Sequence, residues 1–389
     1  MGGAVVQTET DVRERVLRGF GAGDAEVAEL LAYNENAFRL EGAPGPDAFP
    51  LPDEPFVEAW AGYAADAERR GVLPVLREHL VQLRFPVRAG ISATEAYGAA
   101  TRRGVLPGGD IDGGLVLEAP DELRLFLHPT PAGRVPVLVA GSRADFVALL
   151  RALARRNEPD PVPTSMGATA IGGYVNWGRV AELRRRFDAG DLDAGGAPDW
   201  GAAFRWIRER RELYQDRFVL LAPGGYSGVE AADLGLCEEE WLRMSLAIRL
   251  EHECAHYFTR RVLGSMRNAL HDELIADYAG IVGATGRFRA HWFLRFMGLE
   301  DPSTYRPGGR LESYRGTPAL SDGAFAVLQA VVRSAARNLE QVDRRLRSAP
   351  AAELSLPPML LTLASFTLEE LACPGAGGEF PEWFKERPT

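Results

Sequence analysis

The sequence predicts an α+β fold that is mainly helical. Apolar residues recur at intervals of three and four along most of the chain, which is the spacing of amphipathic helices. Short apolar runs bounded by turn residues occur at 114–118, 123–128, 135–140 and 217–221, and they have the length of strands. The fold is therefore expected to combine many helices with a small sheet.

The first part of the chain is expected to form a helical and mixed α/β region. Its helices are predicted at 11–20, 24–38, 54–70, 76–83 and 142–156. Ser142 precedes the last of these helices and suits an N-cap, because its hydroxyl can accept a hydrogen bond from the first turn. The Pro-rich run at 159–163 places a domain boundary between this region, 1–160, whose role the sequence does not indicate, and a second domain at 161–389.

The second domain is expected to be a mainly helical body with a small sheet. Its helices are predicted at 177–187, 199–214, 238–263, 287–297, 321–346 and 360–371, with another beginning near 269. The strand candidate 217–221 leads into a Gly-rich segment, 224–228, that could form a rim or lid. The tail from 374 is expected to be a loop.

The helix predicted at 238–263 contains the sequence His252-Glu253-x-x-His256. Residues four apart lie one turn apart on the same face of a helix, so the two imidazoles can point at one place. Glu253 is rotated by about 100° from His252, which puts its carboxylate beside that place. This is the spacing of a zinc site, and the two histidines need a further ligand.

Glu273 is the predicted third ligand. It lies on the next predicted helix, and zinc in hydrolytic sites commonly takes two His nitrogens and one carboxylate. Asp277 follows one turn later on the same face. Metal-bound imidazoles usually donate their other N–H to a carboxylate or carbonyl, so Asp277 is expected to orient either His252 or His256.

The sequence His-Glu-x-x-His followed by Glu-x-x-x-Asp resembles the gluzincin, or thermolysin-like, zinc metallopeptidases, over roughly 35–40 residues. The resemblance implies a zincin-like core in 161–389, made of the site helix, a second ligand helix and a small sheet. It implies that His252, His256 and Glu273 bind Zn²⁺, that Glu253 is the catalytic base, and that Asp277 supports a ligand histidine. The metzincin pattern is excluded, because Thr259 and Val262 stand where it requires Gly and His.

Two features depart from the gluzincin pattern. Asp272 stands where the thermolysin type has Asn, and the sequence does not identify the downstream His or Tyr that stabilises the oxyanion. The sequence offers four candidates for that donor: Tyr226, His291, Tyr314 and Arg315. Tyr314 is favoured because it follows Glu273 in a Ser-Tyr-Arg-Gly segment.

Composition and the absence of certain segments limit the compartments and the partners that we expect for this protein. A net charge of −10 argues against nucleic acid or an anionic membrane as partner. No apolar run approaches the ~18 residues of a transmembrane helix, and the first ten residues lack the pattern of a signal peptide. The three cysteines are too few for a disulfide framework. A cytoplasmic protein is predicted, and its oligomeric state is left open.

The sequence leaves three functional classes open. The first is a zinc hydrolase that cleaves a peptide or amide bond, and the second is a metalloenzyme on the same scaffold that acts on a small molecule. The third is a non-catalytic metal-binding protein, against which Glu253 argues, because a structural site has no use for that carboxylate. If 217–221 is an edge strand, it could pair with an extended peptide; the alternative is an ordinary internal strand.

Overall fold

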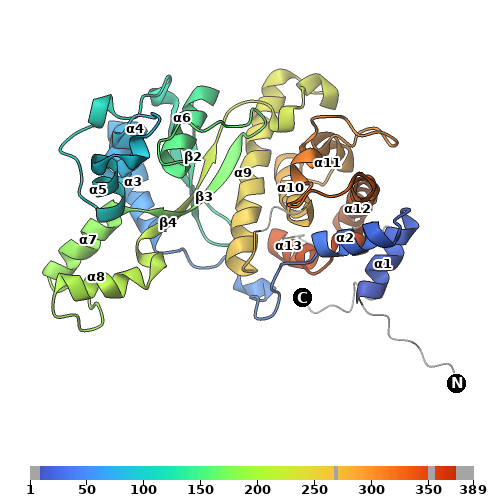
Figure 1. Ribbon diagram of the computed structural model, residues 1–389, viewed down its shortest axis with the longest axis horizontal. Coiled ribbons are helices and arrows are strands. Elements are labelled where there is room, and N and C mark those ends of the chain that lie inside the picture. Colours follow the sequence, from blue (N-terminus) through green and yellow to red (C-terminus); the bar gives the residue numbers. More distant parts are fainter. Residues whose placement is uncertain (1–8, 267–269, 349–354, 374–389) are drawn as a thin grey trace. The chain divides into compact units, whose positions relative to one another are not determined.

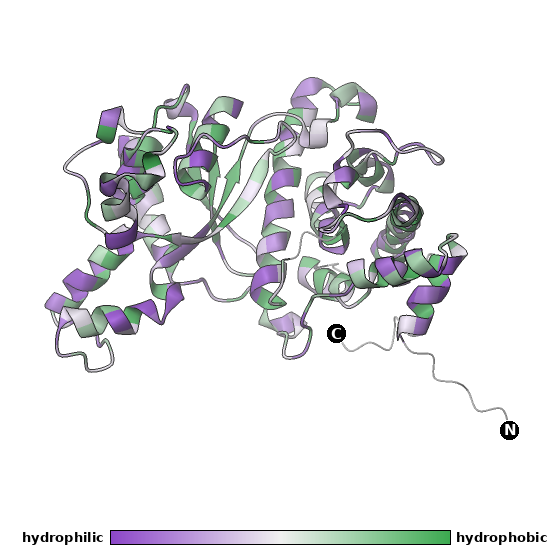
Figure 2. Cartoon of the chain, in the orientation of Figure 1, coloured by the Kyte–Doolittle hydropathy of each residue, from purple (hydrophilic) through white to green (hydrophobic). Residues whose placement is uncertain are grey.

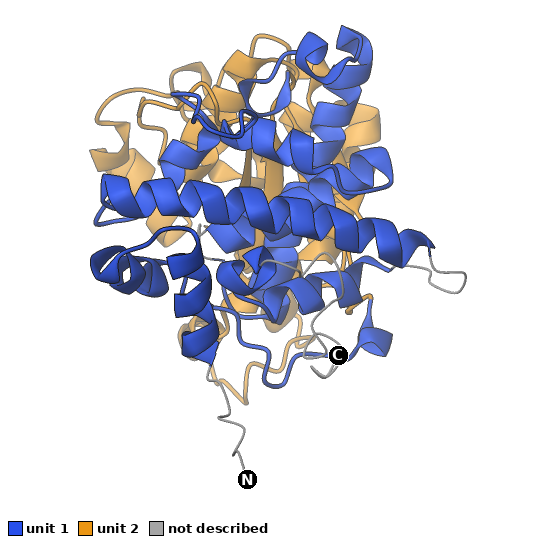
Figure 3. Cartoon of the chain, turned by 90° about the vertical axis from the view of Figure 1, so that its right-hand side faces the viewer, with its two compact units in different colours: residues 1–49, 225–389 blue, residues 50–224 orange. Residues whose placement is uncertain are grey.

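The computed structural model describes residues 9–266, 270–348 and 355–373. The described chain is mainly helical and contains one four-stranded sheet, which confirms the predicted α+β class (Figure 1). It falls into two compact units: unit 1 comprises Met1–Phe49 and Gly225–Thr389, and unit 2 comprises Pro50–Gly224 (Figure 3). These limits differ from the predicted boundary near 160, because strands from both sides of 160 pair in one sheet. The predicted loop from 374 lies outside the described residues.

The sheet of unit 2 has the strand order β1-β2-β4-β3. Its strands are β1 Arg124–His128, β2 Val135–Val139, β3 Ala168–Val175 and β4 Gln215–Leu221. β1 pairs with β2 and β3 pairs with β4 in antiparallel fashion, whereas β2 and β4 run parallel. All of β2 is buried, and the hydropathy colouring of Figure 2 shows a largely apolar sheet. The sheet therefore forms the centre of unit 2.

One predicted strand is absent, one strand was not predicted, and the strand predicted at 217–221 is internal. Residues 114–118 form no strand, and the possibility that 217–221 is an edge strand fails because β4 bonds to β2 on one side and to β3 on the other. β3 was missed because its sequence is rich in small residues. Gly173 has a φ of 72° at an irregularity in the register, a conformation that glycine adopts readily.

Unit 2 also contains six α-helices: α3 Phe56–Arg70, α4 Val72–His79, α5 Glu95–Arg103, α6 Arg143–Ala154, α7 Trp177–Asp188 and α8 Trp200–Arg208. Of these, α3 and α6 pack on the sheet. The predicted cap of α6 is present, since Ser142 Oγ accepts a hydrogen bond from the backbone N–H of Asp145 at 3.0 Å. Trp60, Phe146 and Phe218 share one buried cluster, which joins α3 and α6 to the sheet.

A buried ion pair ties β4 to the start of α7. Asp216, on β4, is fully buried and accepts hydrogen bonds from Trp60 Nε1 at 2.8 Å, Asn176 Nδ2 at 2.7 Å and Arg179 Nη1 at 2.5 Å. The side chain of Arg179 is only 9% exposed. Both charges are thus removed from water and depend on each other.

The substitution Asp216→Ala is expected to lower the free energy of unfolding by about 3–5 kcal/mol, because it leaves the Arg179 guanidinium buried without its partner. Asp188→Ala is the matched control on α7. Asp188 pairs with Arg184 at 3.7 Å and both side chains are 60% exposed, so the expected loss is below about 1 kcal/mol. Urea unfolding of the two variants measures both losses. Equal losses of unfolding free energy in the two variants would contradict the stabilising role of the buried Asp216–Arg179 pair.

Unit 1 contains eight described α-helices: α1 Glu9–Gly19, α2 Asp24–Tyr33, α9 Glu238–Val262, α10 Leu270–Thr285, α11 Ala290–Met297, α12 Asp322–Ser348, α13 Leu356–Ala364 and α14 Leu368–Ala372. The chain's first helices join this unit through buried polar contacts. Arg13 Nε lies 3.3 Å from the Glu369 carboxylate, and Asn34 donates to the same carboxylate at 3.0 Å. Within the described residues, no helix is both long and apolar enough to cross a membrane.

α9 and α10 lie against each other along much of their length (Figure 1). Small residues on α10 permit this approach. A Cβ atom at Gly280 would lie 2.7 Å from the carbonyl oxygen of Ile248, and one at Gly283 would lie 2.6 Å from Cγ of Glu251. Because glycine stands at both positions, the polar side chains of the two helices can meet in the space between them.

Candidate metal centre

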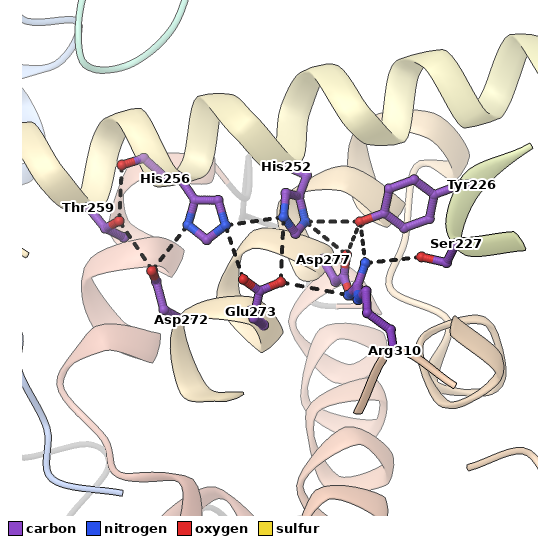
Figure 4. A network of polar contacts seen from close by, with 9 residues as sticks. All are labelled: Tyr226, Ser227, His252, His256, Thr259, Asp272, Glu273, Asp277 and Arg310. Atoms are coloured by element: carbon purple, nitrogen blue, oxygen red, sulfur yellow. Dashed lines mark hydrogen bonds and ion pairs between the residues drawn. The ribbon is translucent and has the colours of Figure 1, made fainter. Parts of the chain in front are cut away.

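α9 presents two buried histidines toward α10. His252 and His256 are 7% and 5% exposed, and their ring centroids are 4.7 Å apart. Their Nε2 atoms face each other at 3.1 Å (Figure 4). The structure thus brings the two imidazoles together as the four-residue spacing predicts.

Glu273, on the first turn of α10, completes the group. Its Oε1 lies 3.5 Å from His256 Nε2, and its Oε2 lies 3.6 Å from His252 Nε2. The ligand atoms of the three residues are all within 4.8 Å of one another, and all three side chains are buried. The group could hold a metal ion.

The outer nitrogens of both histidines contact carboxylates. His252 Nδ1 lies 2.9 Å from Asp277 Oδ1, and His256 Nδ1 lies 3.1 Å from Asp272 Oδ2. The second contact is an ion pair. An ionised carboxylate only accepts, so these contacts place a proton on each Nδ1 and leave each Nε2 lone pair free for a ligand.

Each of the two histidines thus has its own aspartate. The sequence assigned Asp277 to either His252 or His256, and the structure places it at His252. Asp272 stood out in the sequence only as a departure from the thermolysin type, yet it is the carboxylate at His256. Thr259 Oγ1 also donates to Asp272, at 3.3 Å. The signal in the sequence was a carboxylate directly before the predicted ligand Glu273.

The electrostatics of the centre favour ionised carboxylates. Burial raises the pKa of Glu273, but His256, His252 and Arg310 lower it by more, and the result is far below the ordinary range. The pKa of Asp277 is likewise lowered, since Arg310 and His252 outweigh burial. Of the three carboxylates, Glu273 and Asp277 contact the Arg310 guanidinium, and Asp272 contacts His256. With neutral imidazoles this group carries two excess negative charges, which a divalent cation would neutralise.

The donor set also fits zinc chemically. Two imidazole nitrogens and one carboxylate oxygen are the ligands of many hydrolytic zinc sites. The two facing Nε2 atoms have no polar hydrogen between them once each Nδ1 carries the proton, so either a proton or a cation must separate them. The residues present therefore fit a divalent metal ion.

Glu253 is buried on α9, one residue after His252. Its position on the helix is the one that the His-Glu-x-x-His spacing requires. Its role as general base stays a prediction.

Of the four oxyanion candidates, Tyr314 is the one whose hydroxyl contacts the ligand Glu273. It ends the short helix η9, Arg310–Tyr314, and Tyr33 donates a hydrogen bond to its backbone oxygen. Burial, followed by the negative charge of Glu273, raises the pKa of Tyr314, and its hydroxyl contacts that carboxylate. Tyr314 therefore remains protonated at neutral pH.

The other three candidates lie elsewhere. Tyr226 donates to Asp277 Oδ1 at 2.7 Å, on the Nδ1 side of His252. Arg315 pairs with Asp322 at 2.8 Å and with Glu312 at 3.3 Å. His291 lines a separate pocket between α11 and α12, bordered by Asp233, Arg295, Glu300, Arg337 and Glu340.

Arg310 was not anticipated from the sequence. Its guanidinium contacts Asp277 and lies 3.9 Å from Glu273 Oε2. Arg310 follows Glu273 by 37 residues in a loop without periodicity, so no local pattern connects it to the site.

Fold and site together define a helical α+β protein with a buried His-His-Glu group able to hold a metal ion. A family profile matches residues 15–375 and is described as a family of unknown function, DUF7005. The chain belongs to this family. Comparison with curated proteins and with solved structures found no match.

Proposed function

We propose that the chain is a zinc-dependent hydrolase that cleaves a peptide or amide bond, and that α9 and α10 form a zincin-like core. One observation carries the proposal. His252 Nε2, His256 Nε2 and Glu273 converge while Asp277 and Asp272 hold the outer nitrogens. Glu253 is buried on α9 directly after His252, and we assign it the role of general base.

A bound zinc ion would supply a Lewis acid that polarises the substrate carbonyl and lowers the pKa of a water molecule. Glu253 accepts a proton from the attacking water and delivers it to the leaving nitrogen. The water oxygen bonds to the carbonyl carbon, and the C–N bond then breaks. The Tyr314 hydroxyl, which keeps its proton, donates to the oxygen that becomes negative when water adds.

The number of ligands argues against a purely structural metal. Within the described residues the group has three members. A structural zinc site is usually closed by a fourth protein ligand, whereas a catalytic site keeps that position for water or substrate.

One observation favours a second candidate, a metalloenzyme that acts on a small molecule. Extended peptides commonly bind by adding a strand to a free sheet edge. β4, the strand considered for this role, is internal, and the described part of unit 1 contains no strand. A small substrate needs no such edge.

Cleavage profiling of the zinc-loaded protein against a peptide library separates the two candidates. The hydrolase proposal predicts new termini at a restricted set of peptide bonds, absent from a parallel reaction with Glu253→Gln. A fully zinc-loaded protein that cleaves no peptide would contradict the peptidase and leave the small-molecule enzyme. Cleavage that persists in Glu253→Gln would indicate a contaminating protease.

A further inference from the structure

Arg310 makes the densest set of polar contacts beside the metal centre. Its side chain is 15% exposed. Nη1 donates to the Tyr226 hydroxyl at 2.7 Å and to Ser227 Oγ at 3.1 Å. Nη2 donates to Asp277 Oδ2 and lies 3.9 Å from Glu273 Oε2 (Figure 4). One guanidinium from η9 thus contacts two other segments, α10 and the turn at Tyr226.

These contacts fix the orientation of the Asp277 carboxylate. Oδ1 accepts from His252 Nδ1 at 2.9 Å and from the Tyr226 hydroxyl at 2.7 Å, and Oδ2 accepts from Arg310. The Tyr226 hydroxyl in turn accepts from Arg310. Rotation of the carboxylate would break several of these bonds at once. The imidazole of His252 therefore has a fixed partner on its Nδ1 side.

The turn that carries Tyr226 is held in an uncommon backbone conformation. It is the short helix η7, Tyr226–Gly228, and Ser227 has a φ of 53°. A non-glycine residue in this left-handed region is unfavourable and is retained where surrounding contacts hold it. Arg310 provides one such contact at Ser227 Oγ, and Ser245 Oγ accepts from the Tyr226 backbone N–H at 3.0 Å.

We propose that Arg310 is a positioning residue of the metal centre. It holds Asp277 on His252 and docks η7 and η9 against α10. The inference rests on the proposed metal site and adds a residue that acts, through Asp277, on His252 and not on the other ligand histidine. His256 has its own carboxylate, Asp272, which the Thr259 hydroxyl contacts instead.

The geometry requires arginine rather than any cation. The two Nη atoms reach different acceptors, Tyr226 and Ser227 on one side and Asp277 on the other. A lysine supplies the same charge from a single nitrogen and cannot span both sides. The variant Arg310→Lys therefore separates the effect of charge from the effect of position.

Zinc affinity of the metal-stripped full chain, measured by competition with a chromogenic chelator, tests this role first. Arg310→Gln is expected to weaken zinc binding by roughly 10–100-fold. This is the usual loss of metal affinity when a group that orients a metal-bound histidine is mutated. Arg310→Lys is expected to fall between Arg310→Gln and the unchanged chain. Arg315→Gln, which removes an arginine of the same segment paired outside the site, is expected to bind zinc as the unchanged chain does.

The cobalt-substituted protein supplies a readout that a merely structural role would not move. Paramagnetic NMR of the Co²⁺ form should show one shifted, exchangeable Nδ1–H signal for each ligand histidine. Arg310→Gln is expected to shift or broaden only the His252 signal. Tyr226→Phe removes a hydroxyl that contacts Arg310, Asp277 and His252 Nδ1, and it is expected to perturb the same signal. Arg310→Lys, which keeps the charge, replaces Arg310→Gln if that variant does not fold. Asp272→Asn should perturb the other signal, which identifies that signal as His256 and the first as His252.

The outcomes are distinct. If Arg310→Gln binds zinc with unchanged affinity and both Nδ1–H signals stay in place, the positioning role is overturned while the metal site stands. If both signals move equally in Arg310→Gln and in Tyr226→Phe, the role at His252 is also overturned. If the unchanged chain binds no zinc, the proposed function itself fails.

Discussion

Replacing Glu253 with Gln is expected to lower turnover by about 10²–10⁴-fold while the metal stays in place. Gln keeps the size of the side chain but has no carboxylate to accept a proton from the attacking water. His252, His256 and Glu273 are untouched, so zinc content should be unchanged. Turnover of a substrate found by profiling, measured together with zinc content, checks both halves of this result.

Glu239→Gln is the matched control for this substitution. It makes the same chemical change on the first turn of α9, where Glu239 is exposed. Its turnover is expected to equal that of the unchanged chain. An active, zinc-loaded Glu253→Gln variant would remove Glu253 from the chemistry.

Metal removal is expected to destabilise the protein substantially. A ligand that binds only the folded chain stabilises it by about 4 kcal/mol at 1,000 times its dissociation constant. Without the cation, the carboxylates of Asp272, Glu273 and Asp277 remain buried together, and Arg310 and a proton on His256 oppose them in its place. Thermal unfolding of the chelator-treated protein, followed by zinc addition, should therefore show a lowered and then restored midpoint.

Two variants test the origin of this stabilisation. His256→Ala is expected to lose the response to zinc, whereas His291→Ala, at an exposed histidine on α11, is expected to keep it. A zinc-induced shift of equal size in His256→Ala and in the unchanged chain would place the metal elsewhere.

The size of the zinc response should depend on pH. Burial lowers the pKa of His256, but Asp272 and Glu273 raise it by more, and the net pKa in the metal-free chain lies well above the ordinary value. A proton on His256 therefore stabilises the metal-free fold at low pH, and this contribution is lost as pH rises through the raised pKa. The same proton competes with the metal. Zinc-induced stabilisation should accordingly grow as pH rises.

The site helices were predictable because their signals are local. His252 and His256 lie four residues apart, and Glu273 and Asp277 repeat that spacing on the next helix, so helical geometry alone brings each pair to one face. The packing of α10 on α9 through Gly280 then brings the two faces together.

Arg310 and the place of the chain's first helices were not predictable in this way. Arg310 reaches Asp277 from an irregular segment, and the contact depends on the conformation of η9. Arg13 and Glu369 are 356 residues apart in sequence, yet their buried pair joins α1 to α14. Neither pairing leaves a periodic pattern in the sequence.

The sheet was predicted only in part, because the strands leave local signals in the sequence but their long-range pairing does not. β1 and β2 have compact apolar sequences with a short turn between them, and both were found. The pairing of β4 with both β2 and β3 joins segments far apart in sequence, so composition did not distinguish an internal strand from an edge strand.

The central claim is that His252, His256 and Glu273 hold a divalent metal ion. Metal analysis of the purified chain and of His252→Ala tests it most directly. The structure predicts about one zinc ion per unchanged chain and a loss of that zinc in His252→Ala, because two remaining ligands cannot hold the ion tightly. Full zinc occupancy in His252→Ala, or an unchanged chain that takes up no zinc after metal addition, would contradict the claim.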